Sequence, residues 1–475
     1  MTAKRKNVYP ERSRRVFVAM SGGVDSSVAA ALLKKEGYDV VGVHMRCYNI
    51  DGCAAEDAED ARRAAEVLGI PFYVFDFEDE YKKKVVDYMV RGYREGITPN
   101  PDVMCNKEIK FGLFLKKALE MGADYVATGH YVRLTSSANS ESITNKRIHQ
   151  RTANLLRINE FLNIIIRKFA TDSLLVDKPQ SSFVNSNKIR YSLMVARDQN
   201  KDQSYFLWTL TQEQLRRCLF PIGGYLKAEV RVLARKFGLP NALKKDSQGI
   251  CFLGKVTLQD FLKEYIPERR GEVLLIPNNY SPSGARYDSG AQSRGYINLG
   301  IHHGAHLYTI GQRHLGVNFQ FPTCPSRRRV SNFQNDRKPI YVAEKDIKTN
   351  TLVVAEGDDN PALYRREIKL QDVNIINLQY SNILQNVGIF GIKVYARVRY
   401  RQPLAKATLV ISNSQLVNGN TNIKNQLPVT NYQLLFDTPI KFVAPGQSAV
   451  FYASSEALAK EDSVQYEMLG GGIIA

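Results

Sequence analysis

Residues 21–27, Ser-Gly-Gly-Val-Asp-Ser-Ser, have a composition that suits the binding of an anion. They follow an apolar run at 16–20 and precede a stretch with helical periodicity, so we expect them between a strand and a helix. Two adjacent glycines let the backbone wrap closely around a phosphate, and the start of the helix supplies free N–H groups and partial positive charge. The Gly-Lys-Ser/Thr ending of a Walker A loop and the Gly-x-Gly-x-x-Gly fingerprint are both absent. The motif therefore predicts a phosphate-binding loop of another type.

Two of the six cysteines lie in sequence contexts that favour a reactive thiol. The cysteines form no Cys-x-x-Cys pair, which argues against a zinc site. Cys105 precedes a helix expected to start near Glu108 and has two lysines nearby, whereas Cys251 follows a Lys-Lys pair in a glycine-flanked loop. A helix N-terminus and nearby cations lower the pKa of a thiol, so we expect both to be chemically active. Four others are expected to be small buried hydrophobes: Cys47, Cys53, Cys218 and Cys324.

The elements that must position these residues alternate between strand and helix over residues 16–134. We expect strands at 16–20, 40–45, 72–75 and 125–128 and helices at 26–35, 54–68, 81–93 and 109–121. Near-continuous apolar strands separated by helices indicate a parallel sheet covered on both faces. From about residue 273 the pattern changes to short strands, with antiparallel strands expected at 394–400, 407–411, 432–436 and 448–452. These predict an α/β protein with an N-terminal parallel-sheet nucleotide domain, a small central domain and a C-terminal antiparallel β-barrel.

The expected domain boundaries follow these changes in pattern. We place the phosphate-loop domain at 1–215, the central domain with Cys251 at 216–320 and the barrel at 340–475. A basic stretch rich in Ser and Asn, at 135–195, reads as an insertion in the first domain. Three further stretches, about 276–299, 317–338 and 412–431, are also expected to be insertions.

The composition is that of a globular protein with a polyanionic partner. Of the 475 residues, 44% are hydrophobic and 24% are charged, which argues against general disorder. A net charge of +18 favours a partner such as a nucleic acid. No apolar run of about 18 residues occurs, so no membrane association is expected. Unclustered cysteines favour a cytoplasmic location, with the mitochondrial matrix as the alternative because of the basic N-terminus.

Several long motifs in order resemble a known family. The loop resembles that of the N-type ATP pyrophosphatases, which cleave ATP between its α- and β-phosphates and adenylate a substrate. Six further stretches resemble the tRNA-specific 2-thiouridylases of that superfamily: Thr98–Phe111, Ala127–Tyr131, Lys201–Leu207, Asp246–Phe252, Arg399–Gln402 and Pro445–Tyr452. The resemblance covers about three quarters of the chain: 16–134, 197–266, 300–316 and 340–474. The stretch after Gln312-Arg313 contains less glycine than is usual in the family.

The resemblance implies an ATP-dependent 2-thiolation of the wobble uridine, position 34, of tRNA. Adenylation would make the uridine 2-oxygen a leaving group, and a cysteine persulfide would supply sulfur, giving 2-thiouridine, AMP and diphosphate. Cys251 would carry the persulfide, and Cys105 would end in a disulfide with it. The acceptors would be the tRNAs for Lys, Glu and Gln, and the upstream sulfur donor a cysteine desulfurase or a sulfur-relay protein.

The resemblance also implies site residues. The ATP site would be formed by Ala19, Met20, Ser21, Gly22, Gly23, Val24, Asp25, Ser26, Met45 and Gly129. Asp25 would act in catalysis by directing Mg²⁺ to the pyrophosphate, because Mg²⁺ uses one or two carboxylates together with phosphate oxygens. Contacts with tRNA and its flipped-out target base would come from Asn100, Pro101, Asp102, His130, Lys201, Asp202, Gln203, Arg399, Tyr400 and Gln447.

Two rival functions remain open from the residues themselves. The same loop could serve another adenylating enzyme, such as a tRNA lysidine synthetase or an amide-forming synthetase, neither of which needs a cysteine pair. A non-catalytic RNA-binding protein with a vestigial loop is the other alternative. The intact loop and the presence of both Cys105 and Cys251 favour the sulfur-transfer interpretation over both.

Overall fold

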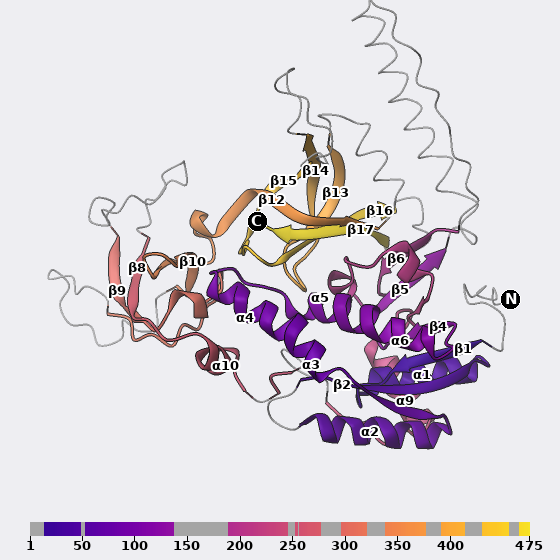
Figure 1. Cartoon of the computed structure of the whole chain (residues 1–475). Helices are drawn as coiled ribbons and strands as arrows, with labels where there is room; N and C mark the ends of the chain where they lie inside the picture. Colours follow the sequence, from indigo (N-terminus) through magenta and orange to yellow (C-terminus); the bar gives the residue numbers. More distant parts are fainter. Residues whose placement is uncertain are drawn as a thin grey trace, which may run out of the picture.

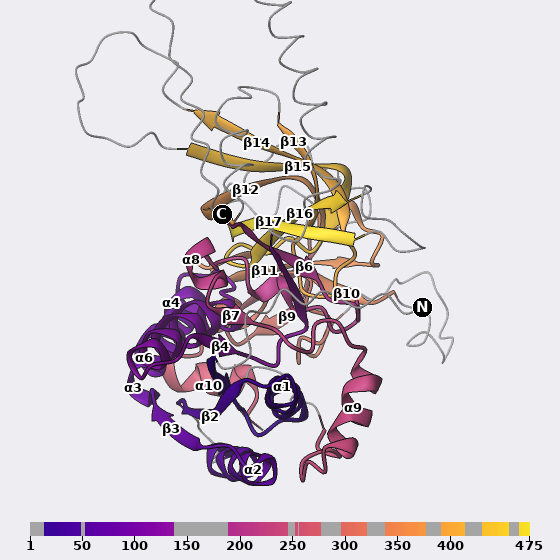
Figure 2. The ribbon, with the colours of Figure 1, turned by 90° about the vertical axis from the view of Figure 1, so that its right-hand side faces the viewer.

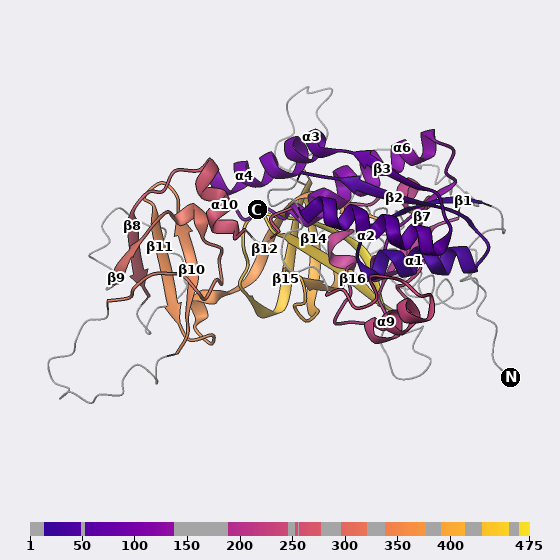
Figure 3. The same ribbon diagram turned by 90° about the horizontal axis from the view of Figure 1, so that it is seen from below.

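A computed structural model describes residues 14–48, 53–136, 189–245, 252–254, 256–276, 296–320, 338–376, 391–413, 430–455 and 465–475. The parallel sheet and its helices lie at the lower right of Figure 1, a second sheet lies at the left, and a β-barrel lies above them. Seen from below, the second sheet and the parallel sheet lie toward opposite ends of the molecule (Figure 3).

The phosphate-loop domain is built on a five-stranded parallel sheet of order β3-β2-β1-β4-β7. Its strands are β1 (Arg15–Ala19), β2 (Asp39–Arg46), β3 (Phe72–Asp76), β4 (Tyr125–Ala127) and β7 (Cys218–Leu219). Val16 and Val18 of β1 pack with α1 (Val24–Lys35), α2 (Cys53–Leu68) and α9 (Lys227–Lys236). Phe17 and Ala19, on the opposite face, pack with the helices of residues 78–120. The sheet is therefore covered on both faces, which confirms the expected architecture (Figure 2).

The helices on the second face form two long rods. The first joins α3 (Glu78–Tyr81), the π-helical segment η1 (Lys82–Val86) and α4 (Asp87–Arg94). The second joins α5 (Pro101–Met104), the π-helical segment η2 (Cys105–Phe114) and α6 (Leu115–Glu120). The expected start near Glu108 is wrong, because Asn100 caps the helix by accepting a hydrogen bond from the Val103 N–H at 3.2 Å and Pro101 stands at its first turn. None of the described helices is long and apolar enough to span a membrane.

Strands of the fold occupy the edges of the expected insertions. β5 (Val132–Ser136) pairs antiparallel with β6 (Tyr191–Val195), so the insertion expected at 135–195 is too wide at both ends. Residues 137–188 lie outside the described part of the chain. The insertions expected at 276–299 and 412–431 are likewise too wide, because residues of the strands β9 (Ile297–His302), β14 (Ala405–Asn413) and β15 (Thr430–Lys441) fall within them.

The central sheet has four strands in the order β10-β11-β8-β9. They are β8 (Gly271–Leu275), β9 (Ile297–His302), β10 (Ile340–Asp346) and β11 (Thr351–Glu356). Residues 340–356, which were expected in the barrel, pair here because β11 runs parallel to β8 with Val353 opposite Leu274. The remaining short elements of the described chain are η4 (Ser204–Phe206), α8 (Gln212–Leu215), α10 (Leu258–Tyr265), η6 (Ala305–Leu307) and η7 (Pro361–Leu363).

The C-terminal strands close into an antiparallel barrel of order β12-β15-β14-β13-β16-β17, with β17 returning to pair with β12. They are β12 (Tyr364–Ile375), β13 (Ile392–Arg397), β14 (Ala405–Asn413), β15 (Thr430–Lys441), β16 (Ser448–Ser455) and β17 (Gln465–Ile474). The interior is filled by alternate apolar residues such as Val394, Leu409 and Phe451. β17 also pairs with β6, so one strand both closes the barrel and joins it to the phosphate-loop domain.

Candidate active site

The phosphate loop lies between β1 and α1, where the sequence placed it. Gly22 has a φ of 75°, and a Cβ there would lie 2.3 Å from the Asp57 carbonyl oxygen, so only glycine fits. The Ser26 hydroxyl accepts a hydrogen bond from the Ser21 N–H at 3.2 Å and donates to the Gly23 carbonyl at 3.2 Å. These bonds hold a tight turn at the start of α1, and the helix N-terminus gives it the character of an anion site.

Two other residues expected at the ATP site lie at the same edge of the sheet. Gly129 follows β4, and a Cβ on it would lie 2.7 Å from the Ser26 backbone nitrogen. Its lack of a side chain therefore allows the chain to pass against the first turn of α1. Met45 lies near the carboxyl end of β2, beside the strand that leads into the loop. Ligands bind at this edge of open parallel sheets.

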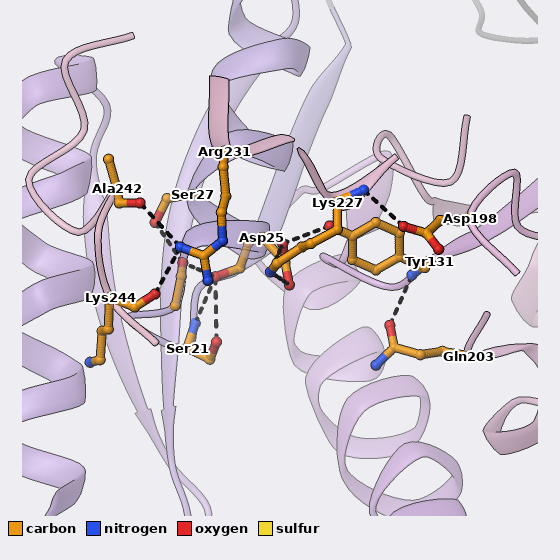
Figure 4. Close-up of polar contacts among 12 residues, drawn as sticks. Ser21, Asp25, Ser27, Tyr131, Asp198, Gln203, Lys227, Arg231, Ala242 and Lys244 are labelled. Carbon is orange, nitrogen blue, oxygen red and sulfur yellow. Dashed lines mark hydrogen bonds and ion pairs between the residues drawn. The ribbon is translucent and has the colours of Figure 1, made fainter. Parts of the chain in front are cut away.

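Asp25 is held by two side chains that the sequence analysis did not single out. Lys227 Nζ lies 2.8 Å from both carboxylate oxygens, and the Tyr131 hydroxyl donates to Oδ1 at 2.9 Å (Figure 4). Tyr131 ends one of the quoted motifs, but Lys227 lies 202 positions from Asp25 and stands in no local pattern that points to it. The pairing of Asp25 with Lys227 could therefore not be predicted from neighbouring residues in the sequence.

This arrangement does not fit Mg²⁺ held by Asp25. Both carboxylate oxygens already face one ammonium group, which would lie beside any bound cation and repel it. Over the described part of the chain, no three His, Cys, Asp or Glu residues cluster so as to hold a metal. The residues present give Asp25 a lysine partner instead.

A strap at residues 241–245 fastens the loop to the neighbouring helices. Asn241 Nδ2 donates to the Gly22 carbonyl at 2.8 Å and to the Ser27 hydroxyl at 3.0 Å. Lys244 Nζ reaches Asp57 at 2.7 Å and Asp60 at 2.6 Å, both on α2. Arg231 of α9 donates to the carbonyl of Lys244 at 3.2 Å (Figure 4). The strap leads directly to the segment that contains Cys251, which lies outside the described residues.

Cys105 lies inside its helix and not before it. The side chain is buried, with 7% of the residue exposed. Burial raises the pKa of the Cys105 thiol, and the charge of Asp102 raises it further, whereas Lys110 and a hydrogen bond from Tyr81 oppose the increase. The expectation of a lowered pKa is therefore wrong in this arrangement, because desolvation outweighs the nearby cation. Burial also raises the pKa of Asp102.

The segment that follows Cys251 is anchored near Cys105. Phe252 is 2% exposed, and its ring centroid lies 5.8 Å from that of Tyr81 and 5.5 Å from that of Phe261. The pairing of Cys105 with Cys251 stays a prediction, since the second thiol is outside the described residues. Of the other cysteines, Cys218 is buried and Cys47 is half-buried. Cys324 and the side chain of Cys53 are not among the described atoms.

The Cys105 helix packs against His130, which follows Gly129, because the ring centroids of Phe111 and His130 lie 6.0 Å apart. Burial has the largest effect on the pKa of Cys105, Asp102 and His130, and the charge of Lys110 acts to lower all three. His130 is 7% exposed, lies 2.7 Å from the Thr128 hydroxyl through Nδ1, and has its pKa lowered well below the usual value by burial. The ring is therefore neutral, and any contact with RNA would be through a hydrogen bond and not a charge.

The loop that contains Asn100 is fixed by the barrel. Gln447 Nε2 donates to the Thr98 carbonyl at 3.1 Å and to the Pro99 carbonyl at 3.2 Å. The Asn100 side chain caps the helix and Pro101 is buried at its first turn. These residues lie one to two turns before Cys105, so the structure brings the expected base-binding residues and the thiol onto one helix start.

The remaining residues expected to contact tRNA are largely engaged within the protein. Asp202 is 3% exposed and forms a buried ion pair with Arg397 of the barrel, and Gln203 accepts a hydrogen bond from the Tyr131 N–H at 2.9 Å. Arg399 donates to the carbonyls of Phe442 and Ile310, and the Tyr400 ring lies 4.6 Å from that of Phe206. Lys201, in the turn before Asp202, is half-buried. Their contact with tRNA stays a prediction.

Comparisons with known proteins give the class of this enzyme. A family model described as the tRNA methyl transferase HUP domain matches residues 14–158 and 156–255, and one described as the tRNA methyl transferase PRC-barrel domain matches residues 292–356. The phosphate loop on a parallel sheet, the central sheet and the barrel, together with these two matches, indicate an enzyme of tRNA modification.

The relatives identify the family. The tRNA-specific 2-thiouridylase MnmA of Karelsulcia muelleri is 35% identical over 453 residues, covering 94% of this chain and 98% of the relative. The corresponding proteins of Flavobacterium johnsoniae and Geobacillus kaustophilus are 34% and 36% identical, covering 97% and 94% of this chain and 100% and 94% of the relatives. The chain belongs to the tRNA-specific 2-thiouridylase family. This confirms the resemblance of its motifs and places it among the tRNA sulfurtransferases.

One solved structure shares only a distant likeness with this chain. A 4-thiouridine synthetase–RNA complex with bound ATP is 16% identical over 54% of this chain and 50% of that chain, with a TM-score of 0.27. A likeness of this size carries no argument about the chemistry.

Proposed function

We propose that this chain replaces the 2-oxygen of uridine 34 in tRNA with sulfur, using ATP to adenylate that oxygen and a persulfide on Cys251 as the sulfur source. The observation that carries the proposal is the position of Cys105. Its helix packs against the chain after β4, where the ring centroids of Phe111 and His130 lie 6.0 Å apart, and Gly129 of that chain lies against the first turn of α1. A thiol and a phosphate site at one edge of a parallel sheet suit an enzyme that activates a substrate and then transfers sulfur.

In the activation step, the loop holds the triphosphate. The N–H groups at the start of α1 face the phosphates, and Lys227 stands beside Asp25 as the nearest cation to the loop among the contacts described. The uridine 2-oxygen attacks the α-phosphorus, the bond to the β-phosphate oxygen breaks, and diphosphate leaves. Asn100 and Asp102, at the start of the Cys105 helix, would grip the edge of the flipped-out base.

In the transfer step, the terminal sulfur of the Cys251 persulfide attacks C2 of the uridine and AMP leaves with the former 2-oxygen. The Cys105 thiolate then attacks the Cys251 sulfur. The sulfur–sulfur bond breaks, the pair of electrons stays with the sulfur on C2, and a Cys105–Cys251 disulfide forms. An external thiol reductant must supply two electrons to restore both cysteines, and a cysteine desulfurase or relay protein must reload the persulfide. The acceptors proposed are the tRNAs for Lys, Glu and Gln.

One reaction mixture tests this function against its rivals. The protein is incubated with ATP, a persulfide donor and unmodified tRNA, and the products are assayed as AMP, diphosphate and thiouridine retarded on a mercury-containing gel. The proposal expects all three in equal amounts. AMP without thiouridine would identify a different adenylating enzyme, and tRNA binding with no AMP would identify a non-catalytic RNA-binding protein.

A further inference from the structure

Tyr81 lies near both Cys105 and Phe252, the residue that follows Cys251 in the sequence. It ends α3, on the rod that faces the Cys105 helix, and 3% of the residue is exposed. Both rods belong to the same apolar core, which also contains Cys105 and Phe252. The hydroxyl of a buried tyrosine usually has a hydrogen-bond partner.

Hydrogen bonding from the Tyr81 hydroxyl acts to lower the pKa of the Cys105 thiol, and the two side chains share one apolar core. Four effects act on the charge of this thiol: burial and Asp102 disfavour the thiolate, whereas Lys110 and Tyr81 favour it. Asp102 and Lys110 belong to the Cys105 helix, so Tyr81 is the group from a neighbouring element that favours the charged form. A hydroxyl that donates to a buried thiolate replaces part of the hydration that burial removes.

The ring of Tyr81 makes the second contact. It meets Phe252 edge-on, with the ring planes at 68° and the centroids 5.8 Å apart. Phe252 directly follows Cys251 in the sequence and is also packed against Phe261 and near Tyr48, 5.5 and 6.3 Å away. Edge-to-face pairs of this kind have a preferred geometry, so the ring sets where the residue after Cys251 sits.

We propose that Tyr81 is a positioning residue for the sulfur-release step, holding Cys105 through its hydroxyl and the segment after Cys251 through its ring. The proposal rests on the proposed function, in which the Cys105 thiolate attacks the Cys251 sulfur. It assigns Tyr81 two separable tasks: the hydroxyl supports the thiolate, and the ring fixes the approach of the second segment.

The test replaces Tyr81 by phenylalanine in the full chain, which removes the hydroxyl and keeps the ring. The pH dependence of Cys105 alkylation by iodoacetamide is measured by pulse labelling and mass spectrometry of the peptide. Loss of a hydrogen bond to a charged sulfur should raise the midpoint of the alkylation profile by about one pH unit. At a pH below the midpoint, this corresponds to about tenfold less thiolate. Single-turnover thiolation by persulfide-loaded protein should fall about tenfold near neutral pH and recover as the pH rises. Diphosphate formation should stay unchanged.

Two further variants make the outcome specific. Tyr93→Phe removes another buried hydroxyl from the same rod, one that bonds Thr309, and should leave the alkylation profile unmoved. Phe252→Leu removes the ring contact, and should slow single-turnover transfer without shifting the Cys105 profile. The profile of Tyr81→Phe matching the wild type would overturn the inference, and so would normal transfer in both Tyr81→Phe and Phe252→Leu. Failure of the proposed function is seen separately, as normal turnover in Cys105→Ser.

Discussion

Replacing Arg397 by methionine should loosen the barrel from the phosphate-loop domain. The guanidinium of Arg397 pairs with the carboxylate of Asp202, and these side chains are only 8% and 3% exposed. Arg397 also donates to the Tyr452 hydroxyl at 3.0 Å, and Ser204 joins the network by donating to Asp202 at 2.8 Å. The substitution therefore removes one charge from a buried network and leaves the other in place.

The expected loss of stability follows from that burial. Breaking a buried ion pair by removing one partner costs about 3–5 kcal/mol, because the remaining charge has no counter-charge. Asp202 keeps the Ala196 N–H at 3.1 Å and the Ser204 hydroxyl as donors, so we expect the lower end, about 3 kcal/mol. In the double variant Asp202→Asn with Arg397→Met no charge remains buried, and the loss should be only about 1 kcal/mol. The double variant should therefore be about 2 kcal/mol more stable than Arg397→Met alone.

The single tryptophan of the chain reports on this contact. Trp208 is 3% exposed, and its Nε1 donates to the Ser448 hydroxyl of the barrel at 2.9 Å. Urea denaturation followed by its fluorescence should show Arg397→Met unfolding at about 1 M less urea, for a slope of about 3 kcal/mol per molar. The matched control is Arg62→Met, which breaks two exposed ion pairs on α2 and should leave the midpoint unchanged.

Two results would refute this reasoning. One is a midpoint for Arg397→Met within about 0.3 M of the wild type, a shift worth about 1 kcal/mol at the same slope. The other is a double variant as unstable as the single one. If Asp202 instead acts by contacting tRNA, Asp202→Asn should weaken tRNA binding. The urea midpoint followed by Trp208 fluorescence should then be unchanged.

Four further outcomes are expected. Asp25→Asn removes the charge that holds Lys227 beside the loop. It should slow diphosphate formation at least tenfold, measured by product release, and leave tRNA affinity in filter binding nearly unchanged. Diphosphate formation at the wild-type rate would contradict this prediction. Cys105→Ser and Cys251→Ser should each abolish multiple-turnover thiolation without abolishing tRNA binding. Mass spectrometry should find that only Cys251→Ser fails to hold the persulfide. A persulfide on another cysteine would overturn the assignment. Deleting residues 140–188 should leave thiolation largely intact, and complete loss in a folded protein would show that the segment is needed. Burial lowers the pKa of His302 to about 4, whereas the same side chain in the unfolded protein binds a proton near pH 6.5. The free energy of unfolding should therefore fall as the pH drops from 6.5 toward 4. Urea midpoints measured over this pH range should decline less in His302→Gln than in the wild type.

The parts of the fold that depend on local sequence were predictable. Strand β1, the loop and α1 follow one another within about twenty residues, and each has its own signal: an apolar run, two glycines and helical periodicity. The start of the Cys105 helix also had a local signal, an Asn-Pro pair that supplies a cap and a first turn, which was outweighed by the periodicity that begins at Ile109. The error placed Cys105 at a helix end, where its thiolate would be stabilised, whereas the structure buries it within the helix and raises its pKa.

The contacts that a local pattern cannot encode were missed. Lys227 meets Asp25 across 202 positions, and Arg397 meets Asp202 across 195. Nothing near either residue in the sequence indicates its partner, because each pair depends on how elements far apart in the sequence pack together. The carboxylate of Asp202, which lies in a motif predicted to contact tRNA, joins two domains through Arg397, and its contact with tRNA stays a prediction.

The pairing of β17 with β6 places a constraint on synthesis by the ribosome. Met468 pairs with Leu193, about 270 positions earlier, so the edge of β6 has no partner until β17 has emerged. At about 5–20 residues per second, that edge waits roughly 15 to 55 seconds with its backbone N–H and C=O groups open. Unpaired strand edges recruit other chains, so this interval is when a nascent molecule is most exposed to misassembly. The yield of active enzyme is therefore expected to depend on how fast the residues of the barrel are translated and on whether chaperones bind the paired strands β5 and β6.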